Sequence, residues 1–316
     1  MEKKQIELNT FIVSPRLGEQ KSDIISFFRK RGEESLEVIS RNYSNMQYKE
    51  KAKAVNKAVS ETRNKLVAAI IQKAQVQQWN RRDLVNAILM TTYCSYVVMI
   101  DMRNSVWPYE YMTFSRRIGE IWELFCKIPF EYPINDLELF IPPLFADVKK
   151  LMTGEIETYI DKLQIQDEQK SQLKCYYNKV WNMVTSGEIK LELDLHFKQD
   201  NVFYNIDFKS GFSSNEKGNT NRLLLVATIF HNLTDNYKCC LFVREKEEEN
   251  NQYFKQLRDS GIWTAFCGDA TYAQIKHFTG FNLKEWIDNH IDWKTDLQHE
   301  TLRQLSVNNL VKYLEW

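Results

Sequence analysis

The sequence contains few of the residues that interrupt regular structure. Of its 316 residues, only 10 are glycine and 6 are proline. Long flexible linkers and low-complexity tracts are therefore not expected, because both depend on such residues. Hydrophobic residues make up 43% of the chain and charged residues 27%, which is enough apolar material for a core of ordinary size. The length predicts one large domain or two of average size.

Signals for export or for a membrane are also lacking. The start, MEKKQIELN, is charged and has no apolar stretch of the kind found in signal peptides. The longest apolar run, ILMTTYCSYVVMI at 88–100, is too short to cross a bilayer as a helix, and charged residues flank it. We therefore expect a cytoplasmic protein without membrane contact, in which this run forms a buried core helix.

Cysteine pairs with the spacing of a metal or redox site are absent. The six cysteines form no Cys-x-x-Cys pair and are scattered over the positions Cys94, Cys126, Cys175, Cys239, Cys240 and Cys267. This scatter favours reduced, partly buried thiols over a disulfide framework or a zinc site.

The net charge is zero, but the charges are unevenly distributed. Residues 1–65 hold 14 Lys and Arg against 9 Asp and Glu, and residues 66–150 hold 9 of each kind, so the rest of the chain is acidic. A neutral total argues against a protein that coats nucleic acid through bulk charge. It remains compatible with a specific binder that gathers a few basic side chains in a cleft.

The chain divides into a helical part and a part that mixes strands with helices. Apolar residues recur every three or four positions in the segments 22–43, 51–79, 81–102 and 108–128. From about residue 187 the pattern predicts strands at 188–197, 202–209, 238–245 and 262–267, and helices at 219–233, 250–260 and 270–279. This order predicts an α/β fold of the α+β type, with a mixed sheet and helices on its faces. We expect a helical N-terminal region at 1–104 and a second domain at 105–316.

The segment LELDLHFKQDNVFYNIDFK at 191–209 predicts a β-hairpin with an unusual polar face. Apolar residues alternate with polar ones along both strands, so each strand has one apolar side. The polar side of the first strand carries Asp194, and that of the second carries Asp207 and Lys209. We expect these three side chains to converge.

The register of the hairpin decides how closely the two carboxylates approach. If Phe197 pairs with Val202, Asp194 lies diagonal to Asp207; a register shifted by two residues places them directly opposite. Facing carboxylates repel each other unless a cation lies between them. Two oxygen ligands with open positions for water and phosphate suit Mg²⁺, and Lys209 projects toward the same place. The pattern therefore favours metal-assisted hydrolysis of a phosphodiester.

This arrangement resembles the PD-(D/E)XK nuclease superfamily, whose motif is an acidic residue, a short hairpin, and then an acidic residue, any residue and Lys. Asp194 matches the first position and Asp207-Phe208-Lys209 matches the last three, although Leu193 stands where the motif's proline would be. The family core is a helix, a hairpin-based sheet, a helix and a further strand, and the predicted order in the second half of the chain is similar. The resemblance covers about half of the chain.

The [DE]-x-K pattern is common by chance and also occurs at 147–149 and 292–294. Only the copy at 207–209 ends an apolar alternating strand and has an acidic partner across a turn. The alternative reading is a solvated sheet face with a cross-strand Asp–Lys pair that contributes a fraction of a kcal/mol.

Within the superfamily, the size, the helical N-terminal region and the run IDFKSGFSSNEKGNTNR are most similar to a type II restriction endonuclease. The resemblance implies Mg²⁺-dependent, sequence-specific hydrolysis of double-stranded DNA. Asp194 and Asp207 would bind the metal, and Lys209 would orient the attacking water or help to deprotonate it. It also implies a homodimer, a cognate DNA methyltransferase as a genetic partner, and an N-terminal region that embraces DNA or mediates dimerisation.

Further residues enter as candidates. The polar loop after the hairpin is expected to contact DNA phosphates or base edges through Ser213, Ser214, Asn215, Lys217, Asn219, Asn221 and Arg222. The alternative is a plain connecting loop in which Asn219 or Thr220 caps the next helix. Many restriction endonucleases take an extra carboxylate from a helix upstream of the hairpin, which makes Glu120 or Glu123 a candidate; the alternative for Glu120 is an ion pair with Arg116.

Two other functions stay open at this point. One is a repair or structure-specific endonuclease of the same superfamily, and the other is a non-catalytic DNA-binding protein on a nuclease-like scaffold. The presence of Asp194, Asp207 and Lys209 together argues against a degenerate, non-catalytic site.

Overall fold

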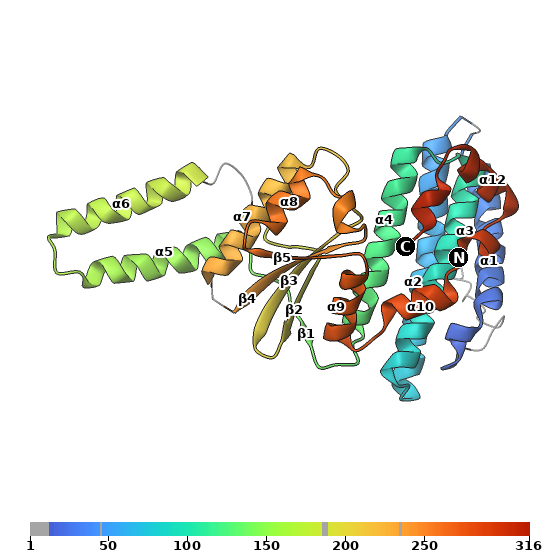
Figure 1. The fold of residues 1–316 in the computed structure, drawn as a ribbon, viewed down its shortest axis with the longest axis horizontal. Helices are drawn as coiled ribbons and strands as arrows, with labels where there is room; N and C mark the ends of the chain where they lie inside the picture. Colours follow the sequence, from blue (N-terminus) through green and yellow to red (C-terminus); the bar gives the residue numbers. More distant parts are fainter. Residues whose placement is uncertain (1–12, 45, 185–188, 234–235) are drawn as a thin grey trace.

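The computed structural model describes residues 13–44, 46–184, 189–233 and 236–316. Three parts follow one another along the long axis in Figure 1: a helical body, a five-stranded sheet, and a hairpin of two helices that projects from the sheet. The C-terminal end of the chain, as labelled there, lies in the helical body.

Four long helices form the N-terminal part of the body and confirm the helices expected from the apolar spacing. After a short 3-10 turn, η1 (Leu17–Glu19), they are α1 (Lys21–Asn42), α2 (Tyr48–Val76), α3 (Arg81–Val106) and α4 (Tyr111–Glu131). The side chain of Asn80 caps α3 by accepting a hydrogen bond from the backbone N–H of Asp83 at 2.8 Å.

The helix α3 is the centre of the body. Among the described residues it is the one helix long and apolar enough to cross a membrane, but 89% of that apolar window is buried inside the molecule. At 26 residues, α3 is longer than the 13-residue apolar run at 88–100 from which it was predicted, and it is long enough to cross a bilayer. Its length therefore does not distinguish a membrane helix from a buried core helix. Its burial among α1, α2, α4 and the C-terminal helices makes it a core helix.

The sheet is mixed, and its strands follow one another in chain order. They are β1 (Glu138–Leu139), β2 (Leu195–Gln199), β3 (Val202–Lys209), β4 (Tyr237–Val243) and β5 (Trp263–Cys267). The first three pair antiparallel, whereas β3, β4 and β5 are parallel. The prediction of a mixed α/β fold is therefore confirmed.

Each face of the sheet is covered by helices and has its own apolar cluster. The helices α7 (Lys217–Leu233) and α8 (Gln252–Arg258) pack on one face together with Cys239, Leu241 and Val243 of β4. The other face packs against α4 and α9 (Asp269–Thr279), and its contacts include the edge-to-face pair of Trp122 and Phe208. A 3-10 turn, η2 (Glu247–Glu249), follows β4.

The hairpin turn contains only Asp200 and Asn201, whose φ angles are 50° and 61°. Two consecutive residues with positive φ form the type of turn that suits tight hairpins, and Asp and Asn tolerate this conformation. Because Gln199 pairs with Val202, the strands adopt the register shifted by two from the Phe197–Val202 pairing.

The first strand of the hairpin begins later than expected. Residues 189–194 are not part of β2, and Leu191 and Leu193 pack on the α7 side while Leu195 and Phe197 pack on the α4 side. The expectation of a single apolar face from Leu191 to Phe197 is therefore wrong. The chain changes direction here because the backbone N–H of Leu193 donates to a side chain instead of a neighbouring strand.

Two regions were not anticipated from the sequence. The helices α5 (Phe145–Lys162) and α6 (Asp167–Val184) are inserted between β1 and β2 and form the projecting hairpin, which we call the arm. At the C-terminal end, α10 (Leu283–His290), α11 (Trp293–Asp296), α12 (His299–Val307) and the 3-10 turn η3 (Val311–Leu314) return to the helical body.

The C-terminal helices bind tightly to α3. The hydroxyl of Tyr93 donates to Asp296 at 2.7 Å, and the side-chain amide of Asn104 donates to Gln304 at 2.7 Å. One apolar cluster joins these helices to α1–α4 and to one face of the sheet. The expected division of the chain at 104/105 stays a prediction.

Candidate active site

The centre of the candidate site is the end of β3. Asp207 and Lys209 lie on the same side of this strand, toward α7, because side chains alternate and Phe208 packs on the α4 side. Leu195 pairs with Ile206, so the position opposite Asp207 belongs to Asp194, one residue before β2 begins. The structure therefore brings Asp194, Asp207 and Lys209 together.

Asp194 is held in place by the backbone of β3. Its Oδ2 atom accepts a hydrogen bond from the backbone N–H of Phe208 at 2.8 Å. The carboxylate of Asp194 therefore accepts the N–H of β3 that a backbone carbonyl of β2 would accept if the pairing of the two strands continued. Asp194 is half-buried, and its second oxygen accepts no hydrogen bond from the described residues.

Asp207 is an almost fully buried carboxylate with 1% of its surface exposed. Within the described part of the chain, neither of its oxygens accepts a hydrogen bond of good geometry. Lys209 forms an ion pair with Oδ1, and Nη2 of Arg222 lies 3.8 Å from Oδ2. Burial, partly offset by Lys209 and reinforced by the nearby charge of Asp194, raises the pKa of Asp207 to about 6.

Lys209 is a charged group. Burial acts to lower its pKa, but the attraction of Asp207 and Asp194 outweighs burial and raises the pKa. Its Nζ atom also donates to the backbone carbonyl of Phe208 at 3.2 Å. A raised pKa favours an ammonium ion that orients and stabilises charge over a neutral amine that accepts a proton.

Two residues from the following segment complete the surroundings. Arg222, on the first turns of α7, donates through Nη1 to the carbonyl of Glu192 at 3.4 Å and so spans the two sides of the site. Glu216 is half-buried, and burial raises its pKa while the nearby Lys209 acts in the opposite direction. Arg222 is the member of the predicted DNA-contacting set that the structure brings to the carboxylates.

The rest of that set lies on the loop before α7 and on its first turn. Asn219 is half-buried, whereas the exposed members are Ser213, Ser214, Asn215, Lys217 and Asn221. The loop is tied to the start of α8, because Tyr253 donates its hydroxyl to Asn215 at 2.7 Å and the side chain of Asn251 donates to the carbonyl of Ser214 at 2.8 Å. Contact of these residues with DNA stays a prediction.

Glu120 lies on α4, which covers the opposite face of the sheet from Asp207. Its carboxylate forms ion pairs with Arg116 at 3.0 Å and Arg117 at 2.9 Å, and Glu123 pairs with Lys127 at 2.6 Å. These pairs match the helix-surface alternative for Glu120. A contribution of Glu120 to the metal site stays a prediction.

The residues present suit a divalent cation with few protein ligands. Among the residues that the structure describes, no group of three or more His, Cys, Asp or Glu is arranged to hold a metal. Mg²⁺ needs fewer, since it is usually bound by one or two carboxylates together with waters and substrate phosphates. Asp207 is a buried carboxylate with a raised pKa that lies beside a second carboxylate, and added positive charge is favourable at such a place.

A buried polar chain next to the site was not foreseen from the sequence. The backbone N–H of Leu193 donates to Nε2 of His196 at 2.8 Å, so the hydrogen of the imidazole is on Nδ1, which donates to Asn205 at 2.7 Å. Asn205 in turn donates to Sγ of Cys239 at 3.8 Å. His196 and Asn205 are the pair next to Asp194 and Asp207 on the same face, so this chain fixes the bend that presents Asp194. The sequence did contain a signal for this chain of hydrogen bonds, because His196 follows Asp194 by two residues and so lies on the same face of the strand.

Comparisons with models of protein families, with characterised proteins and with solved structures find no match to this chain. The functional argument therefore rests on the geometry of the site.

Proposed function

We propose that this protein is a Mg²⁺-dependent endonuclease that hydrolyses phosphodiester bonds of double-stranded DNA. The observation that carries the proposal is Asp207, a buried carboxylate that among the described residues is paired with two cations, Lys209 and Arg222. Keeping such a group ionised is costly, and a purely structural role gives no reason for it. Its neighbours Asp194 and Lys209 are the other two groups of the motif.

The order of elements supports the same proposal. Helix α4, strands β1, β2 and β3, helix α7 and strand β4 repeat the order of helix, hairpin-based sheet, helix and further strand that the resemblance implies. The arm interrupts this order only between β1 and β2, which is a peripheral place for an insertion. We include a core of the restriction-endonuclease type in the proposal on this basis.

The residues of the chain have distinct tasks in this proposal. Asp194 and Asp207 would hold Mg²⁺, which when bound lowers the pKa of coordinated water and stabilises negative charge on phosphate oxygens. Lys209, kept protonated by the two carboxylates, orients the attacking water and stabilises charge that develops on the phosphate. Phe208 holds Asp194 through its backbone N–H, and Arg222 reaches the same place as a second cation.

Among such enzymes we propose a type II restriction endonuclease that acts in the cytoplasm as a homodimer and is accompanied by a DNA methyltransferase. Support for this finer proposal is the resemblance of size and organisation noted in the sequence. Digestion of plasmid DNA tests it, because discrete fragments indicate sequence-specific cleavage, whereas nicking at branched or damaged sites indicates a repair enzyme.

The proposal of catalysis is tested by cleavage of plasmid DNA in Mg²⁺ and in EDTA. We expect Mg²⁺-dependent cleavage that is abolished by Asp207→Asn and by Lys209→Ala. Lys198→Ala serves as the matched control, because it removes a lysine of the same hairpin outside the site and is expected to retain activity. Equal activity of Lys209→Ala and the unmodified chain would falsify the catalytic assignment.

Binding of the metal has a separate readout. Mg²⁺ that binds only the folded state stabilises it by RT ln(1 + c/Kd), where c is the Mg²⁺ concentration, so the midpoint of thermal unfolding rises with the logarithm of c once c exceeds Kd. We expect this rise in the unmodified chain and its loss in Asp207→Asn, without any DNA present. An equal rise in both would place the bound cation elsewhere.

A further inference from the structure

The arm has many exposed apolar side chains, because two helices packed only against each other cannot bury all of them. Of the described residues of α6, none is fully buried. Large apolar side chains are more than one third exposed along the arm, at Leu151, Tyr159, Ile165, Leu173, Tyr176 and Val180. Exposed apolar surface on one projecting element is a mark of an interaction site in soluble proteins.

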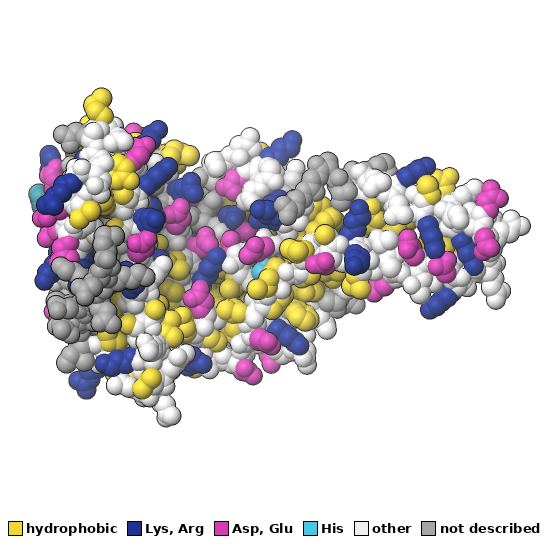
Figure 2. All heavy atoms as spheres, turned by 180° about the vertical axis from the view of Figure 1, so that it is seen from behind, with side chains coloured by type: hydrophobic (Ala, Val, Ile, Leu, Met, Phe, Trp, Pro, Cys, Tyr) yellow, Lys and Arg dark blue, Asp and Glu magenta, His cyan; other side chains and the backbone are white. Residues whose placement is uncertain are grey.

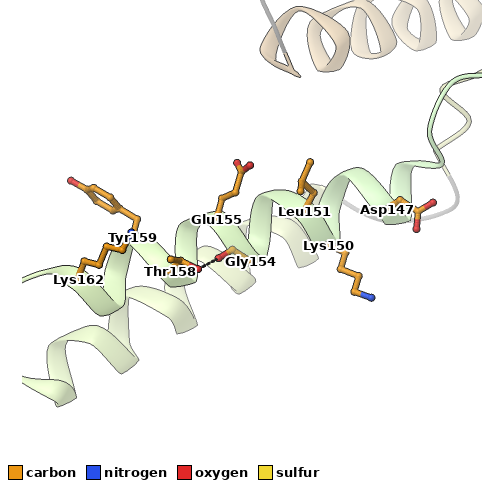
Figure 3. A pocket seen from close by; sticks show the side chains of 8 residues that line it. All are labelled: Asp147, Lys150, Leu151, Gly154, Glu155, Thr158, Tyr159 and Lys162. Atoms are coloured by element: carbon orange, nitrogen blue, oxygen red, sulfur yellow. Dashed lines mark hydrogen bonds between the residues drawn. The ribbon is translucent and has the colours of Figure 1, made fainter.

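The most distinct part of this surface is the outer side of α5. The inner side of α5 packs against α6 through contacts such as the edge-to-face pair of Phe145 and Trp181. On the outer side a shallow groove of about 760 Å³ is lined by residues of α5 alone. Leu151, Glu155 and Tyr159 project from one side of the helix there (Figure 3). No described part of the chain covers this groove.

The charges on the arm argue against DNA as its partner. Residues 145–184 hold 6 Lys and 6 Asp or Glu, and basic and acidic side chains are interspersed along the arm in Figure 2. A surface that binds the phosphate backbone needs an excess of Lys and Arg. A neutral, partly apolar surface suits a protein partner instead.

The outer side of α5 is complementary to itself. Asp147 lies seven residues before Gly154, and Lys162 lies seven residues after Glu155. Neither Asp147 nor Lys162 forms an ion pair with a residue that the structure describes. If two copies of α5 run antiparallel about a two-fold axis between Gly154 and Glu155, each Asp147 lies level with Lys162 of the second copy. The two-fold axis thus brings together Asp147 and Lys162 of the two copies in two symmetric ion pairs.

The centre of α5 permits a close approach. Gly154 is exposed, and a Cβ atom added there would meet nothing within 4 Å. In the same arrangement Leu151 faces Thr158 of the second copy, and Tyr159 faces the aliphatic stem and ammonium group of its Lys150. Apolar side chains of both copies are then removed from water.

From these observations we infer that the outer side of α5 binds α5 of a second copy of this chain, antiparallel and with two-fold symmetry. The contact brings two molecules together through their arms, at a distance from the carboxylates of the candidate site. This inference rests on the homodimer included in the proposed function and names its interface. It fails separately from the proposed nuclease activity, because the oligomeric state and DNA cleavage are measured independently.

Cross-linking tests the position of the axis in the full-length chain. Gly154→Cys in a Cys175→Ser background places a thiol next to the axis after removal of the exposed Cys175. Under mild oxidation we expect a disulfide-linked dimer on a non-reducing gel. Gln172→Cys in the same background, on the exposed side of α6, is the matched control and is expected to stay monomeric.

Charge exchange tests the ion pairs, with sedimentation equilibrium over a range of protein concentrations as the readout. We expect Asp147→Lys and Lys162→Asp each to weaken dimerisation by about tenfold, and the double variant to restore it. Since the two Glu155 carboxylates lie near each other at the axis, Glu155→Gln is expected to strengthen the dimer.

Three results would overturn the inference. One is a chain that stays monomeric at every concentration tested, and another is a dimer that neither single charge reversal weakens. The third is a monomer whose affinity for DNA rises in Asp147→Lys and falls in Lys162→Asp, because DNA would then be the partner of the arm.

Discussion

The carboxylate of Asp194 accepts the backbone N–H of Phe208 at 2.8 Å, at the point where β2 no longer pairs with β3. One oxygen of Asp194 therefore has a structural task, and the other is available to a ligand. The two tasks can be separated by substitution, because an amide can replace a carboxylate as a hydrogen-bond acceptor but not as an anion.

We expect Asp194→Asn to keep the stability of the unmodified chain, since its side-chain oxygen still accepts from Phe208. Asp194→Ala leaves that N–H without a partner and is expected to lower the free energy of unfolding by about 1–2 kcal/mol. Both variants are expected to lose cleavage. Urea unfolding and plasmid digestion measure the two effects, and cleavage by Asp194→Asn would remove the charge of Asp194 from the mechanism.

Asp207 predicts an unusual dependence of stability on pH. Its pKa is about 6 in the folded state and near 3.8 when the chain is unfolded, so the folded state binds more protons between these values. The contribution of Asp207 to stability therefore becomes less favourable as the pH rises from about 4 to 6. The full difference is on the order of 3 kcal/mol.

We expect Asp207→Asn to be more stable than the unmodified chain at pH 8 and to lose this advantage toward pH 4. Urea unfolding of both proteins across this range measures the difference. Asp200→Asn is the control, because this exposed carboxylate lies at the turn of the same hairpin and Asn tolerates its positive φ. A constant difference between the unmodified chain and Asp207→Asn at all pH values would contradict the prediction.

His196 predicts a pH effect of the opposite sign. Burial lowers its pKa below the ordinary value of 6.5, and protonation would remove the acceptor for the N–H of Leu193. Its contribution is present above about pH 6.5 and is lost as the pH falls through the lowered pKa of the folded state.

We expect His196→Gln to be less stable than the unmodified chain at pH 8, by about 1–2 kcal/mol, and the gap to narrow as the pH falls below 6.5. Chemical unfolding at a series of pH values measures the gap. His231→Gln, on the exposed surface of α7, is the control and should show no such change.

Substitution of Glu120 tests whether a third carboxylate takes part in catalysis. Its two ion pairs with Arg116 and Arg117 lie on a largely exposed helix surface, so Glu120→Gln is expected to change stability by less than about 1 kcal/mol. Because α4 covers the face opposite Asp207, we also expect cleavage within a few-fold of normal. Steady-state cleavage rates measure this, and a loss as large as that of Asp207→Asn would instead place Glu120 in the catalytic machinery.

The sequence by itself determined the elements with strong periodicity. The four N-terminal helices, β3 at 202–209 and the helix–strand alternation that follows were predicted to within a few residues. The convergence of Asp194, Asp207 and Lys209 was also predicted from sequence alone. Alternation along a strand places Asp207 and Lys209 on one face whatever surrounds them, because this follows from the geometry of the strand.

Only the tertiary structure decided the register of the hairpin, the late start of β2 and the surroundings of the carboxylates. Both registers had been compatible with the apolar pattern, and the turn at Asp200 and Asn201 selected one. The bend before β2 depends on His196 and Asn205, which meet only when the strands pair. The approach of Arg222 to Asp207 and the return of the C-terminal helices to α3 join residues far apart in the chain, and local periodicity carries no information about such contacts.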